Sequence, residues 1–466
     1  MKFALPLEKL RAYRLILAFA AVVVGLMFTP GAKLLILLYP CGCFYVAFST
    51  FRKDGAQFLE FATWIFFLTP FVRRVVDYET NAREMAIIST PFVILVIPLL
   101  FVVMRWRKVA TRQSAPFFYA IAAILYGVFI ACAHAQFSSA ATGVMTWLTP
   151  IAFGLYLLSE REHVSALYNG FERAMLGGTF VAGAYGLIQY FIVPSWDAAW
   201  MRSVDMVTIG QPEPTEVRVF SILNSPQILA AFLMVGILMA YRMRSRWKYP
   251  ILLAGVASLA LSFARSAWIG LLAGLLFLGF FASPKERIRT ITATIGCALL
   301  VFAAFNVPAL ADALSTRFST FTDLRHDESA LDRKETYAQV IEMLQHSPTG
   351  IGLGVDNGMA DAENDSSVVA VLLSLGIPGA LVFAVALCIC ACTLFSPRAV
   401  RDRSQLLGLQ CCFVGLAVES PLNNVINAQI AFLLWSLIGL SYGIRATQQN
   451  RDFERNQSRV RPLIVN

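Results

Sequence analysis

Long apolar runs recur along the whole sequence, and they constrain the fold more than any other feature. Many of these runs are close to 18 residues or longer, which is about the length that lets a helix cross the hydrocarbon core of a bilayer. Only 14% of the 466 residues are charged, whereas a soluble domain has about 25%. The chain is therefore expected to be an all-α polytopic membrane protein.

The apolar runs predict about 12–14 transmembrane helices. The first run is read as a span and not as a cleaved signal peptide, because no small-residue cleavage pattern follows it. The predicted spans cover residues 12–30, 33–51, 57–72, 86–104, 117–135, 140–158, 173–193, 226–241, 249–264, 267–282, 291–307, 377–395, 405–419 and 426–444.

The distribution of charge between the spans predicts the orientation. When the N-terminus is placed in the cytoplasm, most Lys and Arg residues fall on the cytoplasmic side and most Asp and Glu residues on the other. Positive charge on the cytoplasmic side is the usual rule, so both termini are expected there. The net charge of +9 then reflects topology and contact with membrane lipid headgroups, and no nucleic-acid partner is expected.

The polar segments divide the chain into four predicted parts. The last of them is a basic cytoplasmic tail that we expect to be disordered. The parts are transmembrane helices with an outer loop at 194–225 (residues 1–306), a large periplasmic loop (307–366), C-terminal transmembrane helices (367–444) and the tail (445–466).

The large loop is the longest and most polar segment of the sequence. Residues 330–345 predict a helix inside it that Pro348 and Gly350 end. The glycines at 350, 352 and 354 then indicate a turn with close backbone approach. Four apolar residues of the helix are expected to share one face: Leu331, Val340, Ile341 and Leu344.

Three arginines lie on the predicted outer face against the general distribution of charge: Arg218, Arg265 and Arg333. Arg265 interrupts an apolar stretch, where a charge costs a few kcal/mol. Arginine binds phosphate through a two-pronged contact and keeps its charge, so the three could bind a lipid-linked diphosphate. The alternatives stay open: Arg265 could extend to the headgroups, Arg218 could be an ordinary loop residue, and Arg333 could be a surface residue of the loop helix.

Asp365 ends the large loop directly before an apolar run. Its carboxylate could accept a proton from an attacking hydroxyl or cap the following helix. His346 could equally bind substrate or interact with the dipole at the end of the loop helix. The nine cysteines lie almost wholly in apolar runs. The Cys388-x-Cys390-x-Cys392 pattern has no His or carboxylate beside it, so we predict no metal site and no cofactor.

Four segments in order resemble the O-antigen ligase and Wzy-type polysaccharide polymerase family of bacterial inner-membrane proteins. None of the motifs is specific alone, but together they cover roughly residues 215–395. They are Arg218-Val219-Phe220-Ser221 with Asn224-Ser225-Pro226, then Ser262-Phe263-Ala264-Arg265-Ser266-Ala267-Trp268, then Arg333 to Met343 with His346-Ser347-Pro348 and the Gly350–Gly354 turn, and Leu375-Gly376-Ile377-Pro378-Gly379.

The resemblance implies a metal-independent, inverting glycosyltransferase that acts on undecaprenyl-diphosphate-linked oligosaccharide at the periplasmic face. It implies that Arg218, Arg265 and Arg333 hold the diphosphate. Lys334, His346 and Asn224 lie in the same motif segments and are expected to bind substrate. A flippase and chain-length or export proteins are the expected partners.

The residues before Gly376 favour one activity within the family. Ligases place a His-Asn pair eleven residues before the corresponding glycine, where this chain has Asp365-Ser366. The resemblance therefore favours a polymerase of exopolysaccharide or O-antigen repeat units, with an O-antigen ligase that transfers glycan to lipid A core as the alternative. A secondary transporter is a second alternative, although Glu60 and Glu419 are the only acids well inside apolar runs and no internal repeat is evident.

Overall fold

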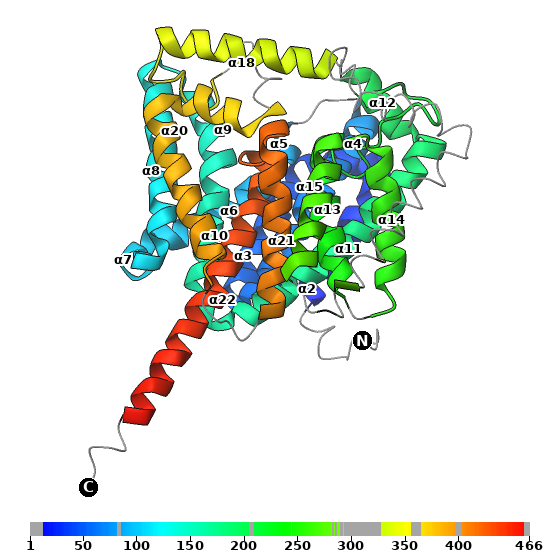
Figure 1. The fold of residues 1–466 in the computed structure, drawn as a ribbon. Helices are drawn as coiled ribbons and strands as arrows, with labels where there is room; N and C mark the ends of the chain where they lie inside the picture. Colours follow the sequence, from blue (N-terminus) through cyan, green and yellow to red (C-terminus); the bar gives the residue numbers. More distant parts are fainter. Residues whose placement is uncertain are drawn as a thin grey trace. The chain divides into compact units, whose positions relative to one another are not determined.

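The structure is a computed structural model. It describes residues 13–81, 85–204, 209–243, 245–281, 328–355, 365–397 and 403–460, together with residues 284, 287, 288 and 292. Helices dominate this part of the chain (Figure 1). The only extended pairing among the described residues is an isolated antiparallel bridge between Gly210 and Val217. The predicted all-α fold is therefore confirmed.

Apolar helices recur through the described residues, as a multi-pass membrane protein requires. Five further apolar helices are shorter, with 10–17 residues each. Apart from Thr292, the predicted span at 291–307 lies outside the described residues. Eight helical segments in the described part are long and apolar enough to cross a membrane: Pro30–Lys53, Gly55–Thr80, Arg112–Ala133, Phe137–Ser159, Arg161–Ile192, Ser367–Leu394, Ser404–Leu422 and Ala428–Gln448.

The chain divides into two compact units, and each combines two separate parts of the sequence. Unit 1 comprises Met1–Ile97 and Gly170–Glu335, and unit 2 comprises Pro98–Asn169 and Thr336–Asn466. Each unit is described by itself. The division into spans, loops and tail made from the sequence stays a prediction.

Several of the helix contacts in unit 1 join helices that follow each other in the chain. In it α2 packs against α3, α3 against α4, and α13 against both α14 and α15, while the short helix α12 packs against α4. The helices are α2 (Arg14–Met27), α3 (Leu35–Lys53), α4 (Gly55–Thr80), α5 (Met85–Ile88), α6 (Thr90–Met104, whose end passes into unit 2), α11 (Val164–Ile192, which begins in unit 2), α12 (Ser195–Ser203), α13 (Pro226–Arg242), α14 (Lys248–Leu261) and α15 (Arg265–Phe281).

Helix α4 ends at Thr80, about two turns beyond its predicted end at residue 72. The Asp54 side chain accepts a hydrogen bond from the backbone N–H of Ala56 and caps its start, and the C-cap is Asn81, which adopts a left-handed conformation. The charges of Arg73 and Arg74 indicated the end of the apolar run in the sequence. The helix continues because each of these arginines forms an ion pair with an aspartate.

Unit 2 contains the remaining helices. In it α8 packs along α20, α10 packs along α22, and α21 also packs against α22. The elements are α7 (Trp106–Val109), α8 (Ala115–Ala133), α9 (Phe137–Gly143), the π-helical turn η3 (Val144–Leu148), α10 (Thr149–Ser159), α18 (Glu328–His346, from Thr336 onward), α20 (Ser367–Leu394), α21 (Arg403–Glu419) and α22 (Ala428–Val460).

Helix α20 is longer than the predicted span at 377–395 and is broken once. It starts at Ser367 and has a single non-helical residue, Gly376, with φ 59° and ψ −173°. At this break the backbone N–H of Ile377 donates to the carbonyl of Pro348, which follows α18. A Cβ on Gly376 would lie 2.4 Å from the backbone nitrogen of Gly350, so only glycine fits this crossing.

The glycine turn after α18 packs tightly against other backbone segments, as the sequence predicted. Gly350, Gly352 and Gly354 all have positive φ. A Cβ on Gly352 would lie 2.5 Å from the nitrogen of Ala131 in α8, and one on Gly354 would lie 2.4 Å from the carbonyl of Ser139 in α9. With Gly350 against Gly376 of α20, the three glycines therefore let this turn pack against three helices of unit 2.

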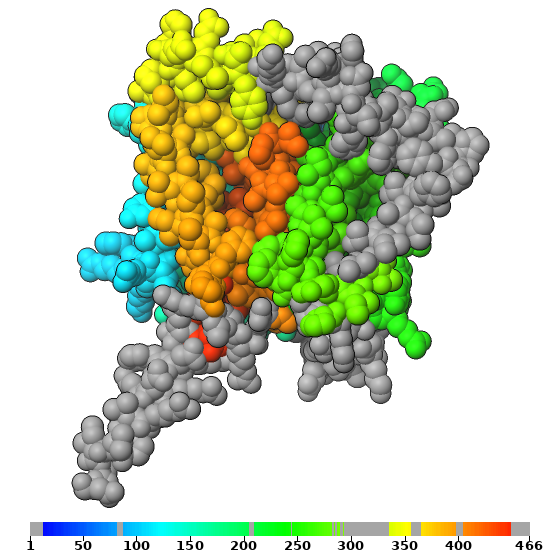
Figure 2. Space-filling view, viewed as in Figure 1, coloured from blue at the N-terminus to red at the C-terminus, as the bar shows by residue number. Residues whose placement is uncertain are grey.

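The predicted loop helix is confirmed as α18, but its apolar face differs in one residue. Val340 is fully buried against Val369 and Leu373 of α20, and Leu344 packs on the same cluster. Figure 2 shows α18, in yellow, lying over the start of α20. Ile341 points away and is 56% exposed, so its expected place on the buried face is wrong. The side chain of Leu331 lies outside the described residues.

The prediction for the C-terminal segment was also wrong. Residues from 445 were expected to be a disordered tail, yet α22 continues as helix to Val460 (Figure 1). The first part of this extension is anchored, because Arg445 donates to the carbonyl oxygens of Leu394 and Ser396 at 2.8 and 2.9 Å. A basic sequence therefore continues the helix here.

Candidate functional site

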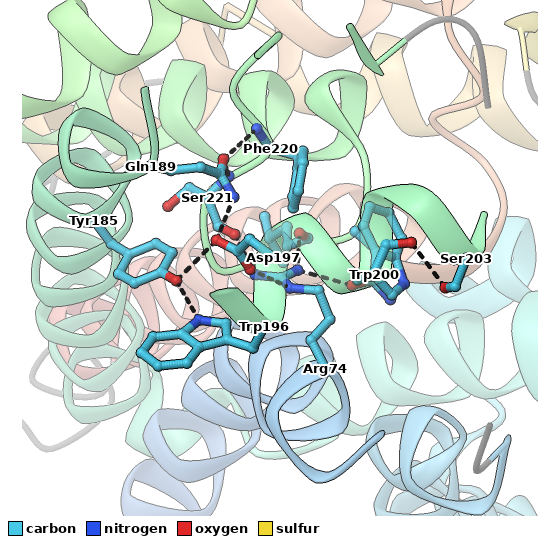
Figure 3. Close-up of polar contacts among 11 residues, drawn as sticks. Arg74, Tyr185, Gln189, Trp196, Asp197, Trp200, Ser203, Phe220 and Ser221 are labelled. Carbon is cyan, nitrogen blue, oxygen red and sulfur yellow. Dashed lines mark hydrogen bonds and ion pairs between the residues drawn. The ribbon is translucent and has the colours of Figure 1, made fainter. Parts of the chain in front are cut away.

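The segment that contains Arg218 and Asn224 is held by a buried ion pair in unit 1 that sequence reasoning missed. Arg74 of α4 and Asp197 of α12 join at 2.9 Å from Nε to Oδ1, and both side chains are fully excluded from solvent. The aspartate also accepts hydrogen bonds from Tyr185 at 2.8 Å and from Gln189 at 2.7 Å (Figure 3). Burying a charge is costly unless its partners are complete, and here both carboxylate oxygens are bonded.

The other donors of the Arg74 guanidinium bind the turn at residues 221–224. They reach the carbonyl oxygens of Ser221 and Leu223 and, at 2.9 Å, the side-chain oxygen of Asn224. The ring of Phe220 lies 5.0 Å from the guanidinium carbon. One side chain of α4 thus fixes both the backbone of the turn and the orientation of the predicted substrate-binding residue Asn224.

Ser221 adopts a conformation that needs such support. Its φ is +53°, a left-handed value that costs a non-glycine residue about 1–3 kcal/mol. Gln189 accepts hydrogen bonds from the backbone N–H groups of Phe220 and Ser221 at 3.0 and 2.7 Å. The Ser221 hydroxyl donates to the carbonyl of Ala182 at 2.6 Å (Figure 3 shows the neighbouring residues). The turn is therefore anchored to α11 as well as to α4.

Arg218 is brought to the turn that precedes Arg265. Its Nε donates to the carbonyl oxygen of Ser262 at 2.7 Å. One of its terminal nitrogens donates to the carbonyl oxygen of Phe263 at 3.4 Å. The next residue, Val219, donates its N–H to Leu261 at the end of α14. These bonds orient the guanidinium of Arg218 at the turn between α14 and α15.

Arg265 is the first residue of α15 and is half-buried. The chain reverses before it through Phe263, whose φ is +52°. The N–H groups at the start of a helix attract anions, and two cationic side chains lie at this turn. Arg218 and Arg265, two of the three arginines singled out from the sequence, are thus on adjoining segments of unit 1.

The other predicted substrate-binding residues lie on α18. Arg333 and Lys334 lie on α18, and their side chains are outside the described residues. His346 is the last residue of α18; it is exposed, and its Nδ1 lies 2.9 Å from the carbonyl of Glu342. This position agrees with the helix-end alternative for His346, and its proposed contact with substrate stays a prediction.

Asp365 lies in unit 2 at the start of α20, and the structure resolves one of its two alternatives. The residue that caps α20 is Ser366, whose hydroxyl accepts from the N–H of Val369 at 3.5 Å. The same hydroxyl lies 3.0 Å from the hydroxyl of Tyr337 in α18. The N-cap residue of α20 is therefore Ser366, and the half-buried Asp365 directly precedes it.

Ser367 fixes the start of α20 to the turn between α21 and α22. Its hydroxyl donates to the carbonyl of Asn423 at 3.0 Å and accepts from the N–H of Val425 at 2.9 Å. Asn423 in turn donates to the fully buried carboxylate of Glu419 at 2.7 Å. Glu419, one of the two acids inside apolar runs, is thus part of the framework that holds the Asp365 segment.

The second such acid, Glu60 of α4, also has local partners. Its carboxylate accepts from Tyr13 at 2.7 Å and from Arg173 at 2.6 Å. The Tyr13 hydroxyl is the donor in the first of these bonds, and it links the start of α2 to α4.

The comparison with protein families agrees with the resemblance seen in the sequence. Residues 250–384 match the family model described as O-antigen ligase. This part includes Arg265, α18, the glycine turn and Asp365, whereas Arg74, Asp197, Arg218 and Asn224 precede it. No curated protein matches the chain. The match at residues 250–384 confirms the resemblance of this part of the chain to the O-antigen ligase and Wzy-type polymerase family.

Proposed function

We propose that the protein is a polysaccharide polymerase that transfers a glycan chain from undecaprenyl diphosphate to a hydroxyl of another lipid-linked repeat at the periplasmic face of the bacterial inner membrane. The family match supports the general class, a membrane enzyme similar to O-antigen ligases and polymerases. The observation that supports a diphosphate site is the attachment of Arg218 to the turn that precedes Arg265. A polymerase is preferred to a ligase because Asp365-Ser366 stands where ligases have a His-Asn pair.

In this proposal the two arginines bind the diphosphate of the donor. When the bond between the anomeric carbon and the diphosphate oxygen breaks, its electron pair stays on the diphosphate. Preoriented positive charge stabilises this developing anion. Because the hydrogen bonds to Ser262 and Phe263 fix Arg218 before substrate arrives, little reorganisation accompanies the reaction.

We assign Asp365 to the acceptor. The acceptor hydroxyl attacks the anomeric carbon, a new carbon–oxygen bond forms, and the hydroxyl proton passes to the Asp365 carboxylate. A single displacement of this kind inverts the anomeric configuration and uses only side chains, without a metal or cofactor. Arg333, Lys334, His346 and Asn224 are proposed to bind the rest of the lipid-linked oligosaccharide.

The test is polymer length in cells that carry Arg218→Ala, Arg265→Ala or Asp365→Ala in place of the native gene. We expect each variant at normal expression to lose high-molecular-weight polymer, whereas Arg107→Ala on the exposed helix α7 should leave it unchanged. Normal polymer from all three site variants would contradict the proposal.

A ligase is the second candidate because the matching family model is described as O-antigen ligase. The two activities leave different products in a deletion strain. Loss of a polymerase removes the ladder of chain lengths and leaves single repeats, whereas loss of a ligase leaves full-length glycan on its lipid carrier and none on lipid A core. Electrophoresis of both fractions decides between them.

A further inference from the structure

The guanidinium of Arg74 binds more of unit 1 than an ion pair requires. Asp197 uses only its Nε, while the two terminal nitrogens bind Ser221, Leu223 and Asn224. If Arg74 only stabilised the packing of α4 and α12, the Asp197 carboxylate and carbonyl oxygens of these two helices could satisfy all its donors. Here the partners instead belong to one short turn more than 140 residues away in the sequence.

The turn that Arg74 binds is also the one that leads away from Arg218. Ser221, with its left-handed backbone, lies three residues after Arg218, and Asn224 lies three residues after Ser221. The path of the chain through Ser221 determines where the backbone of Val219 meets Leu261 of α14 and where the side chain of Arg218 meets Ser262. A change at Arg74 would therefore be transmitted to Arg218 through the backbone.

The buried surroundings of Arg74 strengthen its hold on the 221–224 turn. Its guanidinium carbon lies 5.0 Å from the ring of Phe220 and 5.7 Å from that of Trp200, and its side chain is fully buried (Figure 3). Hydrogen bonds from a charged donor gain strength where water is excluded. The planar fork of arginine serves the turn and Asp197 in one fixed geometry, which a lysine ammonium cannot reproduce.

We infer that Arg74, neutralised by Asp197, is a positioning residue that presets Arg218 and Asn224 for a diphosphate. It does not touch the substrate itself. The inference rests on the proposed function, because it assigns Arg74 an effect on the anion site that Arg218 helps to form.

The experiment measures binding of undecaprenyl diphosphate to the purified full-length protein in nanodiscs, together with its thermal unfolding. The decisive variant is the double change Arg74→Met with Asp197→Leu, which removes both charges and keeps the buried volume similar. Replacing a buried ion pair in this way is often neutral for stability. We expect an unfolding temperature within a few degrees of wild type and affinity at least tenfold weaker.

Arg74→Lys is the second variant, and it keeps the charge opposite Asp197 while losing the fork. It too should weaken binding at least several-fold and leave the protein folded, which keeps the inference testable if the double variant does not fold. The matched control is Arg73→Lys, on the same helix and paired with Asp77 at 3.1 Å, which should bind as wild type does. Wild-type affinity in the folded Arg74→Lys or double variant would overturn the inference.

Two further variants separate this inference from the function on which it rests. If Arg218→Ala and Arg265→Ala bind undecaprenyl diphosphate as tightly as wild type, the diphosphate site itself is wrong, and the positioning role falls with it. If those two variants lose affinity and the Arg74 variants do not, only the positioning role is wrong.

Discussion

Arg218 donates a hydrogen bond from Nε to the carbonyl oxygen of Ser262 at 2.7 Å. This bond joins the 194–225 segment to the turn between α14 and α15. Since Arg265 starts α15 three residues later, two arginines that are distant in sequence meet at one turn. Arg218 and Arg265 together therefore form a candidate anion site at this turn.

Replacing Arg218 with lysine should separate positive charge from orientation. Lysine keeps the charge but cannot bond two adjacent carbonyls and an anion through one planar group. We expect polymer that is shorter than wild type but longer than in Arg218→Ala, measured by gel electrophoresis at matched expression. Wild-type polymer lengths in Arg218→Lys would mean that charge alone suffices.

Asp365→Asn and Ser366→Ala should have opposite effects on activity and stability. Ser366 caps α20 and bonds Tyr337, so its loss should cost about 1 kcal/mol of folding free energy. Asp365→Asn removes the proposed proton acceptor without removing the cap. We expect Asp365→Asn to abolish polymer formation with little change in unfolding temperature, and Ser366→Ala to lower the unfolding temperature and retain activity. A large loss of stability in Asp365→Asn would return the capping role to the aspartate.

Gly376→Ala should destabilise unit 2 strongly. The residue has a φ of +59°, and an added Cβ would lie 2.2 Å from the carbonyl carbon of Thr349. Both the conformation and the clash oppose alanine, so we expect a loss of about 2–4 kcal/mol, seen as a lower unfolding temperature in detergent. The control is Gly25→Ala in α2, where a Cβ would meet nothing within 4 Å and alanine should be neutral or stabilising.

Ser367→Ala should destabilise the junction between α20 and the turn before α22. It removes a hydroxyl that serves the carbonyl of Asn423 and the N–H of Val425, both in a buried setting. Leaving a buried backbone group without a partner costs about 1–3 kcal/mol. Thr142→Ala removes an exposed hydroxyl that bonds only within its own helix, and its thermal unfolding should stay close to wild type.

Tyr13→Phe should weaken the attachment of the start of α2 to α4 by up to about 1 kcal/mol, through loss of the hydrogen bond to Glu60. We expect a slightly lower unfolding temperature for Tyr13→Phe than for wild type, measured in detergent at neutral pH. The exposed Tyr45→Phe is the control.

The sequence by itself determined the class of fold and the place of several elements. Apolar runs of membrane-spanning length lead to helices, because a backbone in lipid must satisfy its hydrogen bonds within the segment. The same local information located α18, its end before Pro348 and the close approach at the glycine turn. It also selected Arg218 and Arg265, because a charge beside an apolar span is unusual wherever it occurs.

Only the tertiary structure decided which distant residues act together. Arg74 looked like the end of a span, and Asp197 looked like one acid of a polar loop, until packing of α12 on α4 paired them across 123 residues. The assignment of the α20 cap to Ser366 and not to Asp365, and the exposure of Ile341, were likewise beyond local patterns. Hydropathy and helix propensity are properties of neighbouring residues, whereas the partner of a buried charge depends on how the helices pack.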